Sequence, residues 1–196
     1  MKAYEGFSAK KDYGDGFGRL PAGNYIGKIK SAKVEEFNWG SFLVIAFDIT
    51  EGDYAGWFQK MFDSDSSDTK KWKGTCRIKI PNASSQYFVS EKRNFENAIA
   101  CIEESNPRFH WDWDETKLKG KVAGFRFRDK EFLNTFGEVI EFTECLNLAS
   151  VDDVKTGKAK LLKPKKLKDE EKPASSAPVE PIKDLDVIDA DDDLPF

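Results

Sequence analysis

Histidine is almost absent from this 196-residue sequence, in which His110 is the only one. Catalytic relays of the Ser-His-Asp or Cys-His type use a histidine as general base, and no nucleophile motif accompanies His110. Phosphate-binding loops of the G-x-x-x-x-G-K type and dinucleotide-binding fingerprints are missing as well. We therefore expect a protein that is not an enzyme, with no catalytic residues and no cofactor.

Cysteine is also scarce. Cys76, Cys101 and Cys145 are too few and too widely spaced for a disulfide framework or a zinc ligand set. The acidic run at 63–68 resembles the start of a calcium-binding loop, but the sixth position lacks the required glycine and the twelfth lacks the bidentate glutamate. The sequence predicts small buried thiols, a flexible polar loop and no metal site.

Long apolar runs are missing too. No stretch approaches the roughly 18 apolar residues that a membrane span needs, and the first residues show no apolar signal core. Charged residues make up 34% of the chain. We expect a cytoplasmic protein with no membrane partner.

The net charge of −4 is unevenly distributed. Residues 1–150 hold 22 basic and 23 acidic side chains, a net charge of −1. The run 155–168 holds seven lysines and no acid, and 184–196 holds six aspartates and no base. Segregated blocks of this kind are typical of solvated interaction tails.

Alternating apolar residues predict strands over residues 25–30, 42–49 and 56–62, with a short strand-like run at 76–80. An apolar stripe at Phe95, Ala98, Ile99 and Ile102 predicts a helix that begins near Ser90 and ends before Pro107. Two further strands are expected at 121–128 and 138–148. The expected order is three strands, a helix and two strands.

This order predicts a mainly β fold, a five-stranded OB-fold (oligonucleotide-binding) barrel with a disordered C-terminal tail. We expect a loose arm at 1–20, the binding domain at 21–150, a linker rich in Lys, Pro and Ser at 151–183 and an acidic partner-docking tip at 184–196.

Binding single-stranded nucleic acid requires cations along the phosphates and flat side chains under the bases. Strand alternation places basic and aromatic side chains on faces turned away from the core, and the loop tryptophans Trp39 and Trp72 add stacking surfaces. Phe132 and Phe136 fall in the loop between the last two strands, which borders the ligand face of such barrels. The predicted nucleic-acid-binding residues are Lys28, Lys30, Trp39, Phe58, Lys60, Phe62, Lys71, Trp72, Arg77, Lys79, Arg126 and Arg128.

Trp111 and Trp113 alternate with aspartates just after the helix. Neighbouring carboxylates repel a phosphate chain, so we expect these two tryptophans to be structural.

The final six residues are the most specific feature: Asp191, Asp192, Asp193, Leu194, Pro195 and Phe196. They resemble the acidic tip of bacterial single-stranded-DNA-binding proteins, with leucine in place of isoleucine. The resemblance implies docking onto replication, recombination and repair enzymes. The terminal phenylalanine would enter an apolar pocket and the aspartates would meet a basic rim.

The domain itself is more similar to the single-stranded-DNA-binding proteins encoded by phages of Gram-positive bacteria. The resembling stretches are 20–25, 45–52, 102–107, 111–114 and 118–121. They imply a protein that coats single-stranded DNA in the host cytoplasm and recruits host or phage enzymes. The resemblance does not identify the residues that contact DNA. Whether the protein forms a homo-oligomer is left open by the sequence.

One alternative is a protein–protein interaction module that uses the barrel face and has no direct DNA role. A more distant alternative is a nuclease or another enzyme that uses the carboxylate clusters for metal-dependent turnover, although the sequence shows no metal-ligand set for it.

Overall fold

The computed structural model describes residues 18–168. Five strands, three α-helices and a short 3-10 helix follow one another in this part of the chain. In chain order they are β1 (Asn24–Phe37), β2 (Gly40–Ile49), α1 (Trp57–Ser64), β3 (Thr75–Lys79), α2 (Phe88–Ser105), η1 (Glu115–Leu118), β4 (Val122–Leu133), β5 (Val139–Ala149) and α3 (Val151–Lys155).

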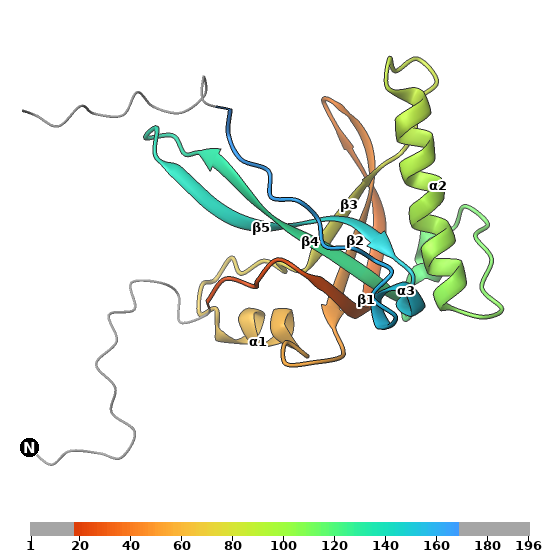
Figure 1. The fold of residues 1–196 in the computed structure, drawn as a ribbon, viewed down its shortest axis with the longest axis horizontal. Helices are drawn as coiled ribbons and strands as arrows, with labels where there is room; N and C mark the ends of the chain where they lie inside the picture. Colours follow the sequence, from red (N-terminus) through yellow and green to blue (C-terminus); the bar gives the residue numbers. More distant parts are fainter. Residues whose placement is uncertain (1–17, 169–196) are drawn as a thin grey trace, which may run out of the picture.

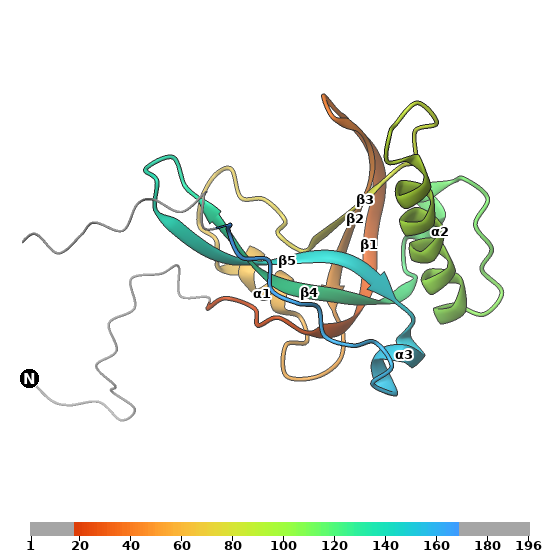
Figure 2. The same ribbon diagram turned by 45° about the horizontal axis from the view of Figure 1, so that its top comes forward.

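The strands form one antiparallel sheet in the order β3-β2-β1-β4-β5. The β1–β2 and β4–β5 hairpins project from the body as two arms in different directions, and α2 stands beside the sheet (Figures 1 and 2). The two edge strands, β3 and β5, approach each other to within 8 Å between Cα atoms. Burial raises the pKa of the Cys145 thiol on β5 well above its ordinary value, and neighbouring Cys76 on β3 adds to this effect. The sheet is therefore strongly curved.

The core lies inside this curved sheet. Phe47 on β2 and Phe125 on β4 are both fully buried, and their rings stack with centroids 3.5 Å apart. Gly27 on β1 allows this packing, because a Cβ at this position would lie 3.0 Å from the Phe125 ring and 2.7 Å from the Asp48 carbonyl oxygen.

The predicted central helix is confirmed as α2, and its stripe of Phe95, Ala98, Ile99 and Ile102 is buried. The helix begins at Phe88, slightly before Ser90. The Asn106 side chain follows its last turn and exchanges hydrogen bonds with the backbone of Val122 at the start of β4. This contact joins the end of the helix to the sheet.

The strand predicted at 56–62 is wrong, because these residues begin α1. Gly56 has a left-handed backbone (φ 71°), and the Asp48 carboxylate accepts a hydrogen bond from the Phe58 backbone N–H in the first helical turn. The apolar residues Trp57, Phe58 and Met61 also fit a helical period, which strand alternation did not reveal. The third strand is instead β3, in the short run expected at 76–80.

The folded part also extends beyond residue 150, so the linker boundary expected there is too early. Ser150 caps α3 by accepting a hydrogen bond from the Asp153 backbone N–H. The following segment runs along β4, where Lys165 exchanges backbone hydrogen bonds with Asp129 and Glu131. The expected arm lies outside the described residues except for its last three positions, and the acidic tip lies wholly outside them. Within 18–168, no helix combines the length and the apolarity that crossing a membrane would require.

Candidate nucleic-acid interface

The sheet face of β1, β2 and β3 that points away from the core carries a band of basic and aromatic side chains, which we call the outer strip. Strand pairing places its members in rows across the three strands. One row holds Glu35, Phe42 and Lys79, and the next holds Lys33, Val44 and Arg77. Phe37 and Trp39 extend the strip at the hairpin end. At the other end we include in it a cluster of Lys30, Phe62, Lys70 and Trp72, in which Trp72 also packs against the core.

The hairpin end forms an aromatic cluster. The rings of Phe37 and Trp39 are stacked with centroids 5.1 Å apart, and Phe42 meets Phe37 edge-on at 5.6 Å. The Lys79 Nζ lies 4.8 Å from the centre of the Phe42 ring and donates a hydrogen bond to the Trp39 carbonyl oxygen. Trp39 remains 68% exposed. An exposed stacked ring beside an ammonium group suits a nucleotide, because the base can stack while the phosphate meets the cation.

The other end of the strip repeats this combination. Lys30 Nζ lies 4.1 Å above the Trp72 ring, and Lys70 Nζ lies 4.8 Å above the Phe62 ring. The two rings are 5.8 Å apart. The Trp72 indole N–H donates to the carbonyl oxygens of Phe47 and Gly74, which fixes the ring against the edge of β2. Lys30 and Phe37 are seven positions apart, so the two clusters are separated by roughly 23 Å along the strand.

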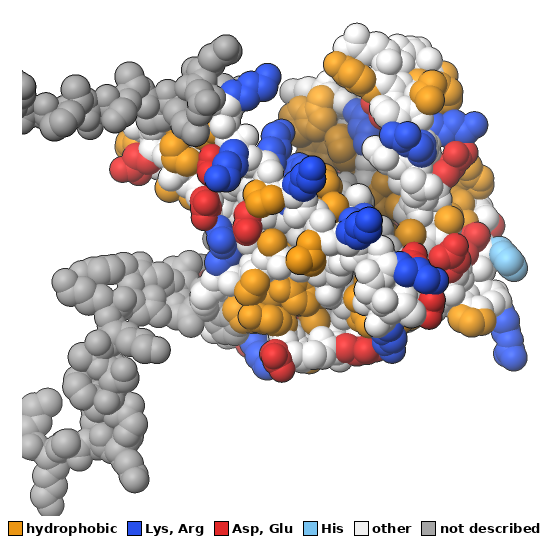
Figure 3. Space-filling view, in the orientation of Figure 1, with side chains coloured by type: hydrophobic (Ala, Val, Ile, Leu, Met, Phe, Trp, Pro, Cys, Tyr) orange, Lys and Arg blue, Asp and Glu red, His pale blue; other side chains and the backbone are white. Residues whose placement is uncertain are grey.

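Arg77 connects the outer strip with a cleft between β3, β5 and α1. The cleft has a volume of about 700 Å³. Among the residues that the structure describes, its basic lining comprises Arg19, Lys73, Arg77 and Lys130, and its acidic lining is Glu144. Figure 3 shows Lys and Arg side chains spread over one face of the molecule, interspersed with apolar patches. The cleft therefore extends the basic surface from β3 toward the β4–β5 arm.

The β4–β5 arm carries a smaller aromatic patch. Phe132 and Phe142 meet edge-on at 5.3 Å, and Lys130 Nζ lies 5.4 Å from the Phe142 ring centre. Phe136 at the tip is 87% exposed. Phe136 occupies the expected connection between the last two strands, whereas Phe132 belongs to β4, which continues to Leu133.

Glu144 on β5 has two cationic partners on β4. Its carboxylate accepts hydrogen bonds from Arg128 Nε at 2.7 Å and from Lys130 Nζ at 3.0 Å. Burial by itself would raise the pKa of Glu144, but the hydrogen bonds from Arg128 and Lys130 outweigh it and hold that pKa below its ordinary value. The carboxylate thus neutralises part of the charge that these cations bring to the arm.

This ion pair predicts a pH-dependent contribution to stability. The folded pKa of Glu144 lies below that of the unfolded chain, so stability rises with pH in this range. The contribution is complete above the ordinary glutamate pKa and is lost as pH falls through the folded pKa. We expect wild type to have a higher Tm than Glu144→Gln at neutral pH, and the difference to shrink as the pH falls below the ordinary glutamate pKa. A difference that stayed constant over this range would contradict the assignment.

The structure brings six of the twelve sequence-predicted residues into the outer strip. Trp39 and Lys79 lie at the hairpin end, Arg77 lies in the middle, and Lys30, Phe62 and Trp72 lie at the other end. Lys71 is exposed beside Trp72. Lys60 is also exposed, but its Nζ donates to the Ala55 carbonyl oxygen at the start of α1.

The remaining four lie elsewhere. Phe58 is only 6% exposed and packs between Phe47 and Phe127, so its expected position on a binding face is wrong. Lys28 is exposed near Gly120, beyond the end of the strip. Arg126 donates to the Lys160 carbonyl oxygen at 2.7 Å, and Arg128 is engaged by Glu144. The two arginines were predicted to share one exposed face. In the structure each instead makes hydrogen bonds to a nearby group of the protein.

The twelve predicted residues do not include Lys33, Phe37, Phe42 and Lys70, which also lie on the strip. The alternation in β2 that identified Leu43, Ile45 and Phe47 as core already assigned Phe42 to the opposite face. Lys33 was hidden by a register shift between Ile29 and Ser31, which changes the faces of the later β1 residues. Recognising that bulge would have identified Lys33.

Trp111 and Trp113 lie away from the strip, beside α2. Trp113 stacks on Phe95 with centroids 6.0 Å apart and Trp111 meets the same ring at 6.4 Å. Trp113 is nevertheless 72% exposed, which makes it comparable in exposure to Trp39. The six predicted partner-binding residues, Asp191 to Phe196, lie outside the described residues.

Neither a protein-family model nor a curated protein matches this chain.

Proposed function

We propose that this protein binds and coats single-stranded DNA without sequence specificity, and that its sheet is an OB-fold barrel. The strand order β3-β2-β1-β4-β5, with its two edge strands close together, supports the barrel. Barrels of this type bind oligonucleotides on the face of their second and third strands and between the 1–2 and 4–5 loops. Both loops carry exposed aromatic side chains in this chain, Trp39 and Phe136.

The observation that carries the proposal is the pairing of aromatic rings with lysines at both ends of the outer strip. Base–aromatic stacking contributes about 1–3 kcal/mol per base and tolerates any sequence. Lysines beside the rings supply the phosphate contacts that dominate affinity for nucleic acids. These two kinds of contact together favour a single strand over a duplex, because paired bases do not offer their faces for stacking.

The acidic end of the chain completes the proposal. Asp191, Asp192, Asp193, Leu194, Pro195 and Phe196 would recruit replication or recombination enzymes, as their resemblance to the bacterial tips implies. The phage-encoded family is the one that the domain resembles, and its members act on DNA in the host cytoplasm. An apolar anchor with flanking acids gives a partner both affinity and fast, salt-sensitive encounter.

Titration of the full chain with labelled dT oligomers tests this proposal. We expect quenching of tryptophan fluorescence on binding, and an affinity that falls steeply between about 50 and 200 mM salt. Duplex DNA of matched length should bind more weakly. A protein-interaction module that uses the same face would show no dT binding at either salt concentration, and this result would overturn the proposal.

A further inference from the structure

The lysine-rich segment 158–168, which we call the strap, is held in a defined position on the sheet. It follows α3 after a turn at Gly157, whose φ is +74°. Asn24 Nδ2 donates to the Ala159 carbonyl oxygen, and Arg126 Nη2 donates to that of Lys160. Farther along, the Lys165 N–H donates to the Asp129 carbonyl oxygen at 2.8 Å, and the Lys165 carbonyl oxygen accepts from the Glu131 N–H at 2.9 Å. Backbone atoms of the strap therefore make these contacts, which leaves its lysine side chains available.

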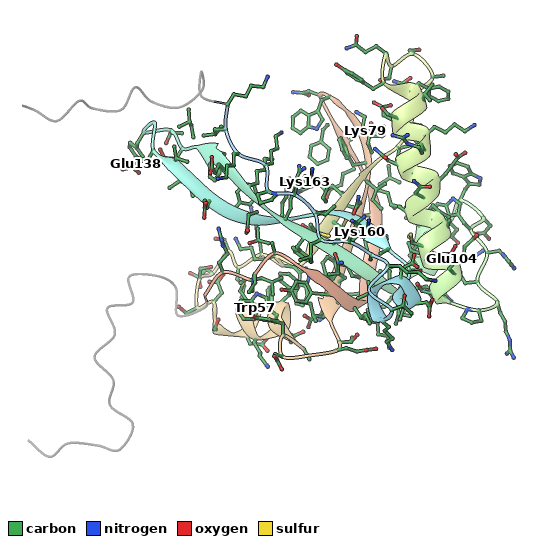
Figure 4. All side chains as sticks on the ribbon, viewed as in Figure 1. Trp57, Lys79, Glu104, Glu138, Lys160 and Lys163 are labelled. Atoms are coloured by element: carbon green, nitrogen blue, oxygen red, sulfur yellow. The ribbon has the colours of Figure 1, made fainter. Side chains whose placement is uncertain are left out.

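Four strap lysines are exposed and have no acidic partner among residues 18–168: Lys160, Lys163, Lys165 and Lys166. By contrast, Lys155 in α3 pairs with Glu51 at 3.2 Å, and Lys158 lies 3.8 Å from Asp152. Lys160 and Lys163 lie on one side of the molecule (Figure 4), where basic side chains follow the course of the strap in the same orientation (Figure 3). Within residues 18–168, the strap thus presents a line of these four lysines that no acidic side chain pairs with.

The nearby acids of β4 and β5 are already engaged by other groups. Asp129 and Glu141 both pair with Arg19 at 3.2 Å. Glu144 is held by Arg128 and Lys130, and the Glu131 carboxylate accepts the Leu167 backbone N–H at 3.0 Å. Three cations, Arg19, Arg128 and Lys130, therefore already offset most of the charge of these four carboxylates.

We infer that the strap is a second phosphate-binding track, which holds the sugar–phosphate backbone of a strand that continues beyond the outer strip and the cleft. An extended segment advances roughly 3.3 Å per residue, so lysines two to three positions apart recur about every 7–10 Å. Such a line can follow a phosphate chain. The strap itself contains no aromatic residue, so it would contribute charge but no base stacking. This inference rests on the proposed function, and it assigns the strap to long ligands rather than short ones.

The test compares wild type with a variant in which Lys160, Lys163, Lys165 and Lys166 are all changed to glutamine. Glutamine keeps much of the aliphatic stem and leaves the backbone contacts in place, and an unchanged Tm would confirm that the variant folds. A matched control changes four other exposed basic residues near α2 and η1 to glutamine: Lys92, Arg93, Arg108 and Lys119. Binding to dT oligomers of about 8 and about 30 nucleotides is measured over a range of salt concentrations, because one barrel occupies roughly 4–16 nucleotides.

For the long oligomer, we expect the slope of log K against log salt to become shallower by up to about three, since each phosphate contact on a single strand contributes about 0.7. The slope for the short oligomer should stay at its wild-type value, and the control variant should behave as wild type with both. Equal slopes for the strap variant and wild type on the long oligomer would overturn the inference. It would also be overturned if the strap variant lost the same slope on both oligomers, or if the control variant lost as much slope as the strap variant. Wild type that bound neither oligomer would instead overturn the proposed function itself.

Discussion

Phe58→Ala is expected to lower the free energy of unfolding by about 3–5 kcal/mol, as is typical for truncating a buried phenylalanine. The Phe58 ring is 6% exposed and fills the space between Phe47 and Phe127, with ring centroids 5.5 Å and 6.4 Å away. Gly74 lies against the same ring, and a Cβ there would come within 2.6 Å of it. Phe58 also forms part of the wall of the cleft, so truncation would leave a gap between Phe47 and Phe127 that the neighbours fill only in part.

Urea unfolding followed by circular dichroism measures this effect, and Phe62→Ala is the matched control. Phe62 lies one turn later in α1, where it is only partly buried and its ring lies between Lys70 and Trp72. We expect the control to cost clearly less stability than Phe58→Ala. If both variants lowered the free energy of unfolding by an equally small amount, the packing of α1 against the core would not contribute to stability as we expect.

The contrast between these two phenylalanines shows where sequence reasoning was misled. Residues 57–62 contain apolar side chains that fit both alternation and a helical period, and a short segment does not separate the two. The deciding contacts are tertiary, since the Asp48 carboxylate on β2 accepts the Phe58 N–H and Gly56 adopts a left-handed turn. The helix α2 was predictable because its stripe extends over two full turns and ends at Asn106.

The candidate site was predictable only in part, for a similar reason. Trp39 could be identified because a tryptophan in a two-residue hairpin connection has little core to enter. The cross-strand rows that place Lys79 beside Phe42 and Arg77 beside Val44 depend on register, which a single sequence does not define. The partners of Arg126 and Arg128 come from the strap and from β5, and so they depended on the tertiary fold.

Two exposed tryptophans on different faces provide the most direct test of the central claim. Trp39 is 68% exposed within the aromatic cluster of the outer strip, and Lys79 Nζ donates a hydrogen bond to its carbonyl oxygen. Trp113 is 72% exposed, but it stacks on Phe95 of α2 and is followed by Asp114. The two residues match in type and exposure, and they differ in whether the neighbouring surface suits a nucleic acid.

The decisive measurement compares the Kd values with which wild type, Trp39→Ala and Trp113→Ala bind the same dT oligomer at one fixed salt concentration. Loss of one stacking contact costs about 1–3 kcal/mol, so Trp39→Ala should weaken binding by roughly five- to 150-fold. Trp113→Ala should bind as wild type does, because its ring lies outside the outer strip. Unchanged binding by Trp39→Ala together with weakened binding by Trp113→Ala would contradict the account, since the nucleic acid would then lie on the α2 face.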